Sequence, residues 1–142
     1  MQTVGQILTK AKGALVTIEA DATVLDALRI MAERNIGAIP ITQGGKLTGI
    51  FTERHYARKV ILEGRQSVDT PVGDVMSTEV YTVEPSQSVD ECMSLMTQHR
   101  VRHLPVMGGG ELIGIVSIGD LVKATIAEHE QTIDELTRYI GG

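Results

Sequence analysis

The chain has 142 residues, enough for one ordinary domain or two small fused ones. A net charge of −5 without blocks of like charge argues against a duplex-DNA footprint, and an aromatic content of 3% argues against base stacking on single strands. No apolar run approaches the roughly 18 residues needed to span a membrane, and no secretory signal pattern is visible at the N-terminus. The single cysteine, Cys92, excludes an internal disulfide and fits a reducing compartment. We therefore expect a cytoplasmic protein with no nucleic-acid or membrane partner.

The first half of the chain has the pattern of one small α+β unit. A short helix is predicted at residues 3–8, and the β-branched residues 15–18 predict a strand. Val24, Leu28 and Met31 form an apolar stripe with helical spacing after the helix-start signals at residues 21–23. Residues 36–41 predict a strand that contains a proline, and two glycines at 44–45 turn it into a hairpin. A closing helix is expected at residues 53–63.

The second half repeats this pattern. An offset of 65 residues aligns Gly49 with Gly114 and Pro40 with Pro105 without a gap. Repetition over this length indicates two copies of one supersecondary unit, here β-α-β-β-α. We predict a first repeat at residues 3–63, a linker at 64–70 and a second repeat at 71–140. Because neither copy alone has much surface to bury, we expect the two to pack as one body.

The sequence G-I-V-S-I-G-D at residues 114–120 is the sharpest signal. It predicts a strand that delivers a hydroxyl, Ser117, and a carboxylate, Asp120, to the start of a helix. Backbone N–H groups at a helix start attract phosphate, and a carboxylate can accept hydrogen bonds from both hydroxyls of a ribose. The alternative is that Ser117 and Asp120 only cap the helix. In the first repeat, Thr52 matches Ser117, but His55 stands where Asp120 stands.

The last helix, predicted at residues 120–140, is longer than its counterpart. Ile126, Ile133 and Ile140 recur every seven residues, with Val122 and Leu136 at the complementary position and His129 interrupting them. Such a seam predicts packing on another helix, for instance in a homodimer. The alternative, that the helix only covers its own sheet, is left open by the sequence.

These features together resemble a tandem pair of cystathionine-β-synthase (CBS) domains, often called a Bateman module. The resemblance covers residues 3–140 and rests on the repeated strand ending in apolar-Pro and the later G-apolar-apolar-[ST]-x-x-D. The run T-E-R-H-Y-A-R-K-V at residues 52–60 resembles that of small bacterial stand-alone CBS proteins, in which aspartate is usual at position 55. The resemblance implies an α+β fold of two β-α-β-β-α repeats packed about a pseudo-twofold axis, with two clefts between them.

The resemblance also implies the ligand and the residues that contact it. Members of the family bind adenine nucleotides and regulate an attached or partner protein. AMP or NAD is expected here, and ATP, ADP or S-adenosylmethionine belong to the same class. The main cleft would use Val16, Ile36, Gly37, Ala38, His103, Pro105, Ser117 and Asp120. The second cleft would use Thr52, Arg54, His55, Tyr81, Val101 and Arg102, where His55 departs from the family pattern. No metal is expected, and the regulated effector would be a separate protein.

An enzyme, a metal-binding module and a structural module are the alternatives to this function. Cys92 lies in an amphipathic helix without a nearby histidine in sequence, and no P-loop or nucleophile elbow occurs, so we do not expect an enzyme. His99 and His103 have i, i+4 spacing, which would suit a metal if both were helical, but residues 101–106 predict a strand. A structural dimerisation module with degenerate clefts is the remaining alternative.

Overall fold

The computed structural model describes residues 2–10 and 15–141. The chain divides into two compact units, one formed by Ala14–Val80 and the other by Met1–Gly13 together with Tyr81–Gly142. Both are mixed helix-and-strand units, which confirms the predicted α+β fold class. The N-terminal helix α1 (Val4–Lys10) therefore belongs to the same unit as the second sequence repeat.

The Ala14–Val80 unit is built on a three-stranded sheet. The short strand β1 (Ile18–Glu19) lies parallel to β2 (Ala38–Gln43), and β2 forms an antiparallel hairpin with β3 (Lys46–Thr52). Helix α2 (Val24–Arg34) is capped by Thr23, whose side chain accepts from the backbone N–H of Asp26, and contributes Val24, Ala27 and Met31 to the core. After β3 come the helical turn α3 (Glu53–His55), the π-helical segment η1 (Tyr56–Ile61) and the 3₁₀ turn η2 (Val72–Asp74).

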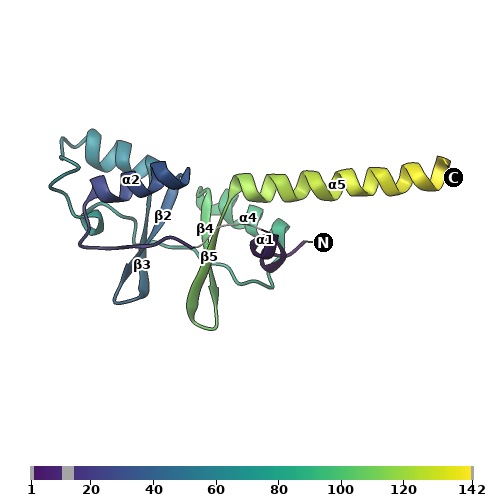
Figure 1. Cartoon of the computed structure of the whole chain (residues 1–142), viewed down its shortest axis with the longest axis horizontal. Coiled ribbons are helices and arrows are strands. Elements are labelled where there is room, and N and C mark those ends of the chain that lie inside the picture. The colour runs from purple at the N-terminus through teal and green to yellow at the C-terminus, as the bar shows by residue number, and fades with distance from the viewer. Residues whose placement is uncertain (1, 11–14, 142) are drawn as a thin grey trace. The chain divides into compact units, whose positions relative to one another are not determined.

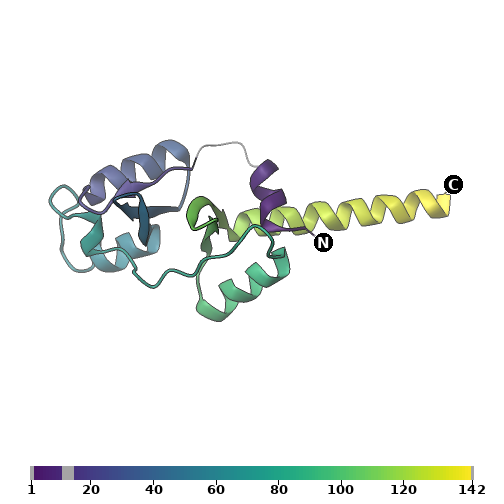
Figure 2. The same cartoon turned by 90° about the horizontal axis from the view of Figure 1, so that it is seen from below.

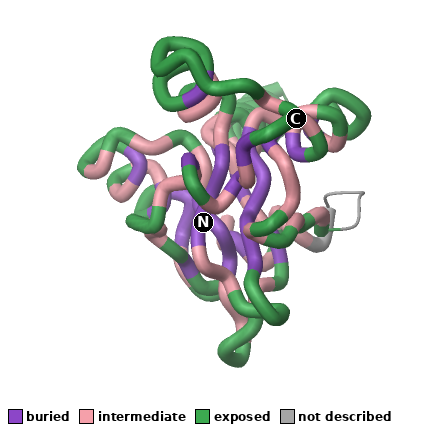
Figure 3. The backbone as a smooth tube through the Cα atoms, turned by 90° about the vertical axis from the view of Figure 1, so that its left-hand side faces the viewer, coloured by how far each residue is buried: buried purple, intermediate pink, exposed green. Residues whose placement is uncertain are grey.

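The second unit repeats this plan with a shorter sheet. Strands β4 (His103–Gly108) and β5 (Glu111–Ser117) form the hairpin, between helices α4 (Val89–His99) and α5 (Ile118–Gly141) in the chain (Figure 1). Both hairpins have the predicted glycine turns, and both shift register after the corresponding residue, Ile41 or Val106. Figure 3 shows that the buried residues lie along the strands, whereas the turns that connect the two strands of each hairpin are exposed.

Three predicted elements differ from their sequence pattern. The strand expected at residues 15–18 is reduced to the two residues Ile18–Glu19, which pair with β2. The strand expected at residues 80–83 is reduced to a bridge, in which the Val83 N–H donates to the Pro105 carbonyl and the Met107 N–H donates to Val83. The closing helix expected at residues 53–63 widens to i→i+5 bonding, as in the bond from the Leu62 N–H to the Ala57 carbonyl. In this turn Val60 is fully buried while Leu62 is 78% exposed.

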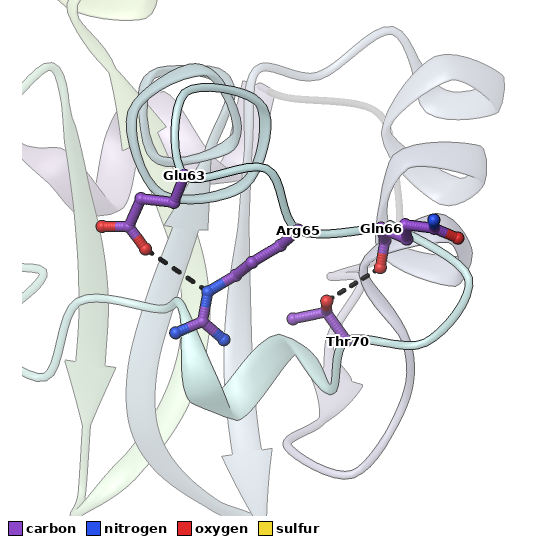
Figure 4. Close-up of polar contacts among 4 residues, drawn as sticks. All are labelled: Glu63, Arg65, Gln66 and Thr70. Carbon is purple, nitrogen blue, oxygen red and sulfur yellow. Dashed lines mark hydrogen bonds and ion pairs between the residues drawn. The ribbon is translucent and has the colours of Figure 1, made fainter.

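The segment predicted as a linker at residues 64–70 is anchored to its own unit. The Thr70 hydroxyl donates to the Gln66 carbonyl at 2.8 Å, and the Arg65 guanidinium lies 3.3 Å from the Glu63 carboxylate (Figure 4). The Ser67 and Thr70 carbonyls accept from the backbone N–H groups of Leu25 and Val24 at the start of helix α2.

No helix in the described part of the chain is both long enough and apolar enough to cross a membrane.

Candidate functional site

In the second unit, the residues singled out by sequence meet at the open end of the β4–β5 hairpin, where β4 begins and β5 ends. His103 pairs directly with Ser117 in the sheet register, and the Ile118 N–H donates to the Arg102 carbonyl at 2.9 Å. Helix α5 begins at Ile118, so Asp120 lies in its first turn. Ser117, Asp120 and His103 are half-buried, Pro105 is buried and Arg102 is exposed. The structure therefore brings a hydroxyl, a carboxylate, an imidazole and a guanidinium-bearing residue to one hairpin end.

Ser117 and Asp120 form a reciprocal cap on helix α5. The Ser117 N–H donates to Asp120 Oδ2 at 2.8 Å, and the Asp120 N–H donates to Ser117 Oγ at 3.2 Å. This satisfies two backbone donors that helix starts leave without intrahelical partners. The capping role considered from the sequence is thus confirmed. It does not use the whole carboxylate, because two ionised oxygens offer about four acceptor positions.

The Ala14–Val80 unit holds the same construction at its own hairpin end. Ala38 pairs with Thr52, and the Glu53 N–H donates to the Gly37 carbonyl at 3.1 Å, in the places of the His103–Ser117 pair and the Arg102 carbonyl. Thr52 and His55 form the matching cap: the His55 N–H donates to Thr52 Oγ1 at 3.2 Å, and the Thr52 N–H donates to His55 Nδ1 at 3.1 Å. His55 therefore takes the structural place of Asp120, with a ring nitrogen as the acceptor.

The hydrogen bond from Thr52 fixes the protonation of His55. A backbone N–H can only donate, so Nδ1 must be unprotonated and the neutral ring carries its proton on Nε2. Burial lowers the pKa of His55 below 6.5, and the nearby cations Lys59 and Arg54 lower it further. The structure therefore favours the neutral imidazole at neutral pH.

The remaining predicted residues lie on the edges of the two cores. Val16 and Ile36 are partly buried against the core of the Ala14–Val80 unit. Tyr81 and Val101 are partly buried against the core of the other unit. The Gly37 carbonyl and the Pro105 carbonyl both accept backbone hydrogen bonds, from Glu53 and Val83. Since each predicted cleft takes residues from both units, the assembly of either cleft stays a prediction.

One aromatic contact was not foreseen from the sequence. The ring of His99, the last residue of α4, stacks on Tyr81 with centroids 3.7 Å apart and planes at 13°. From the sequence, His99 is a candidate only for a metal site with His103. Among the residues that the structure describes, no group of three or more His, Cys, Asp or Glu side chains is arranged to hold a metal ion.

The candidate nucleophile Cys92 lies in the core of its unit. It has no exposed surface, and burial, followed by the neighbouring Glu91, raises the pKa of its thiol. Thiolate is the reactive form of cysteine, so both effects disfavour nucleophilic chemistry.

Comparison with known proteins identifies the family. The CBS domain family model matches residues 4–61 and again residues 72–127. A solved structure of a signal-transduction protein with CBS domains from Burkholderia ambifaria superposes with a TM-score of 0.86 at 52% identity, covering 89% of this chain and 95% of the other. The Bacillus subtilis CBS domain-containing protein YhcV is 39% identical over 105 residues, which are 74% of either chain.

A longer plant relative extends the comparison. The mitochondrial CBS domain-containing protein CBSX3 of Arabidopsis thaliana is 43% identical over 137 residues, 93% of this chain but 66% of the plant protein. The chain thus spans just under two thirds of that relative's length. The repeated family match and these similarities agree with the two repeats and the two capped hairpin ends, and the chain belongs to the CBS-domain family, with two CBS domains in tandem.

Proposed function

We propose that this protein is a regulatory module that binds an adenine nucleotide and signals its level to a separate partner protein. The observation that carries the proposal is the pairing of Ser117 and Asp120 at the start of α5, where a hydroxyl, backbone N–H groups and a carboxylate meet. The carboxylate suits the ribose diol, and the helix start and His103 suit phosphate. The main cleft would add Val16, Ile36, Gly37 and Ala38 around the adenine, as the resemblance implies.

The proposal has finer parts that rest on other features of the chain. AMP or NAD is the expected ligand, and the chain is expected to act as a cytoplasmic homodimer without catalytic activity of its own. A CBS pair is a regulatory module, and the core position of Cys92 supplies no exposed nucleophile. Subcellular fractionation tests the location, which matters because the Arabidopsis relative is mitochondrial.

A ligand panel followed by calorimetry tests the proposal. The unmodified protein is scanned for thermal stabilisation by AMP, ADP, ATP, NAD and S-adenosylmethionine, with zinc as a separate arm for the His99–His103 alternative. The affinity of the best nucleotide is then measured for Asp120→Ala. We expect binding to weaken by about 1.5–3 kcal/mol, the usual range for hydrogen bonds to a charged group.

The cap requires its own control, because Asp120→Ala also removes a helix cap. Glu91 is a matched residue: it lies at the same position of the Ser88–Glu91 cap on α4, where its N–H donates to Ser88 Oγ at 3.1 Å. Glu91→Ala should lower the stability by about 1 kcal/mol, as the loss of a cap does, and leave nucleotide affinity unchanged. Equal affinity in Asp120→Ala and the unmodified protein would rule out the proposed ribose contact. Stabilisation by zinc alone would favour the metal alternative.

A further inference from the structure

The C-terminal half of α5 carries an apolar face that its own unit does not cover. The helix starts in the core, where Leu121 is fully buried, and then extends beyond the other elements of its unit (Figures 1 and 2). Along it Ile126 is 51% exposed, Ile133 61% and Ile140 83%. These exposed fractions rule out the alternative that the helix only covers its own sheet, because such a helix would bury these side chains.

We propose that this face binds the same face of a second copy, as a parallel, in-register, two-stranded coiled coil. The inference deepens the homodimer named in the proposed function but uses none of the nucleotide contacts. In heptad terms the a positions are Ile126, Ile133 and Ile140, and the d positions are Val122, His129 and Leu136. In parallel coiled coils, β-branched residues at a with leucine at d favour two strands, and the layers of Ile133 and Leu136 fit this rule.

The residues outside the a and d positions also fit a two-stranded coiled coil. Ala127, Gln131, Asp134 and Arg138 occupy the outer b and f positions. At the flanking g positions, the hydroxyls of Thr125 and Thr132 donate to the carbonyls of Leu121 and Glu128, at 2.9 and 3.0 Å. Their polar groups are thereby satisfied within the helix. The helix has 24 residues and is about 36 Å long, and beyond its first turns it gains little of the tertiary packing that normally holds helices together.

Charge at the flanking positions selects the parallel arrangement. In a parallel pair each g position faces the partner's next e position, so Glu130 lies beside the partner's Thr125 and Thr137 beside the partner's Thr132. The antiparallel alignment with the longest overlap pairs Ile126 with the partner's Leu136 and sets Glu130 beside the partner's Glu130. Like charges at these positions disfavour an alignment, so the parallel one is preferred.

His129 gives the seam a polar layer. In the parallel register it faces the partner's His129 between the Ile126 and Ile133 layers. A single polar layer specifies register and lowers the stability of a coiled coil. The dimer should therefore be specific in alignment and of moderate affinity.

Sedimentation velocity of the full chain at micromolar concentration tests the surface. We expect a dimer, and we expect Ile133→Glu to raise its dissociation constant by about a hundredfold or more, because it buries two unpaired carboxylates in one layer. Ala127→Glu is the matched control: it also introduces a carboxylate on α5, but at an outer position, and should leave the dimer intact. A monomeric unmodified protein, or a dimer that tolerates Ile133→Glu, would overturn the proposal. Ile133 is exposed, so circular dichroism should show that the variant folds.

Cysteine cross-linking and a second variant test the orientation. Leu136→Cys should form a disulfide-linked dimer under mild oxidation, because d positions face each other in a parallel pair, whereas Gln131→Cys on the outer face should not. Native Cys92 is buried and does not compete. His129→Leu should lower the dissociation constant by about tenfold. Failure of Leu136→Cys to cross-link, or an unchanged affinity in His129→Leu, would overturn the parallel register. A protein that dimerises as described but binds no nucleotide would leave this inference intact and reject the proposed function.

Discussion

His55 and Asp120 occupy the same structural position in the two repeats, and the backbone N–H of each donates to a hydroxyl three residues earlier. Their chemistry differs in one respect that matters for ligand binding. The carboxylate retains acceptor capacity beyond the cap, whereas neutral imidazole has one acceptor, which the Thr52 N–H already occupies. His55 therefore preserves the fold of its repeat while removing the diol acceptor.

The His55 cap should make stability depend on pH. The folded-state pKa of His55 lies below its ordinary value of 6.5, so below that value the unfolded chain binds more protons than the folded one. Stability from this group is fully present above the unfolded pKa and is lost as the pH falls from there toward the folded pKa. Urea unfolding of the unmodified protein should show lower stability at pH 5.5 than at pH 7.5.

The matched variant is His55→Asn, whose amide oxygen can accept from Thr52 and does not titrate. The other histidines are common to both proteins, so the difference between the two pH profiles isolates position 55. We expect the profile of the variant to be flatter. Parallel profiles would show that His55 does not hold the neutral, Thr52-bonded state.

At the scale of elements, a different segment crosses the second hairpin strand of each repeat. The crossing is close because the equivalent glycines Gly114 in β5 and Gly49 in β3 lie at the contact. A Cβ at Gly114 would lie 2.8 Å from the flexible Leu8 side chain of α1. A Cβ at Gly49 would lie 2.8 Å from the carbonyl oxygen of Ser77. This oxygen accepts from the Ile50 N–H, and the Ser77 N–H donates to the Ile50 carbonyl.

Gly49→Ala should therefore destabilise the protein by about 1–3 kcal/mol, because the crossing backbone cannot move without breaking its bridge to β3. Gly119→Ala is the control within a helix. Its Cβ would lie 3.6 Å from Ser117 Oγ, an ordinary contact, and alanine favours a helix over glycine by about 0.8–1 kcal/mol. Urea unfolding should show opposite signs for the two variants. A neutral Gly49→Ala would mean that the 76–77 segment is not fixed as described.

The sequence predicted the repeated elements well where the signal was local. Helices α2 and α4, both hairpins and the extra length of α5 follow from apolar spacing, capping residues and glycine turns. Elements that depend on distant partners were less predictable. The 80–83 strand is only a bridge, the π-helical segment after His55 has no local signature, and the attachment of α1 to the second repeat's unit depends on tertiary contacts.

In the candidate site too, local pairs could be predicted from the sequence, whereas contacts between distant residues could not. The Ser117–Asp120 and Thr52–His55 pairs could be identified by spacing, because a helix cap is made by residues three apart. The stacking of His99 on Tyr81 joins residues 18 positions apart, and no sequence pattern announces it. The tautomer of His55 likewise depends on a bond that only coordinates reveal.

At the scale of the whole molecule, the difference between the repeats predicts unequal nucleotide sites. With one ribose-accepting carboxylate per chain, at Asp120, we expect one AMP per chain, and the site at His55 to be empty or filled by the far half of a longer ligand such as NAD. His55→Asp should restore the missing acceptor while keeping the cap, as Asp120 does in the other repeat. The gain at the second site should be roughly 1–3 kcal/mol.

Calorimetric stoichiometry is the measurement, and it should rise from one toward two AMP per chain in His55→Asp. Thr52 Oγ1 would still receive the N–H of residue 55, so the variant should fold as the unmodified protein does. His55→Asn separates a carboxylate effect from simple loss of the imidazole and should keep the stoichiometry at one. If the unmodified protein already binds two AMP with equal affinity, position 55 is not the ribose contact, and the asymmetry between the repeats must act on something other than the sugar.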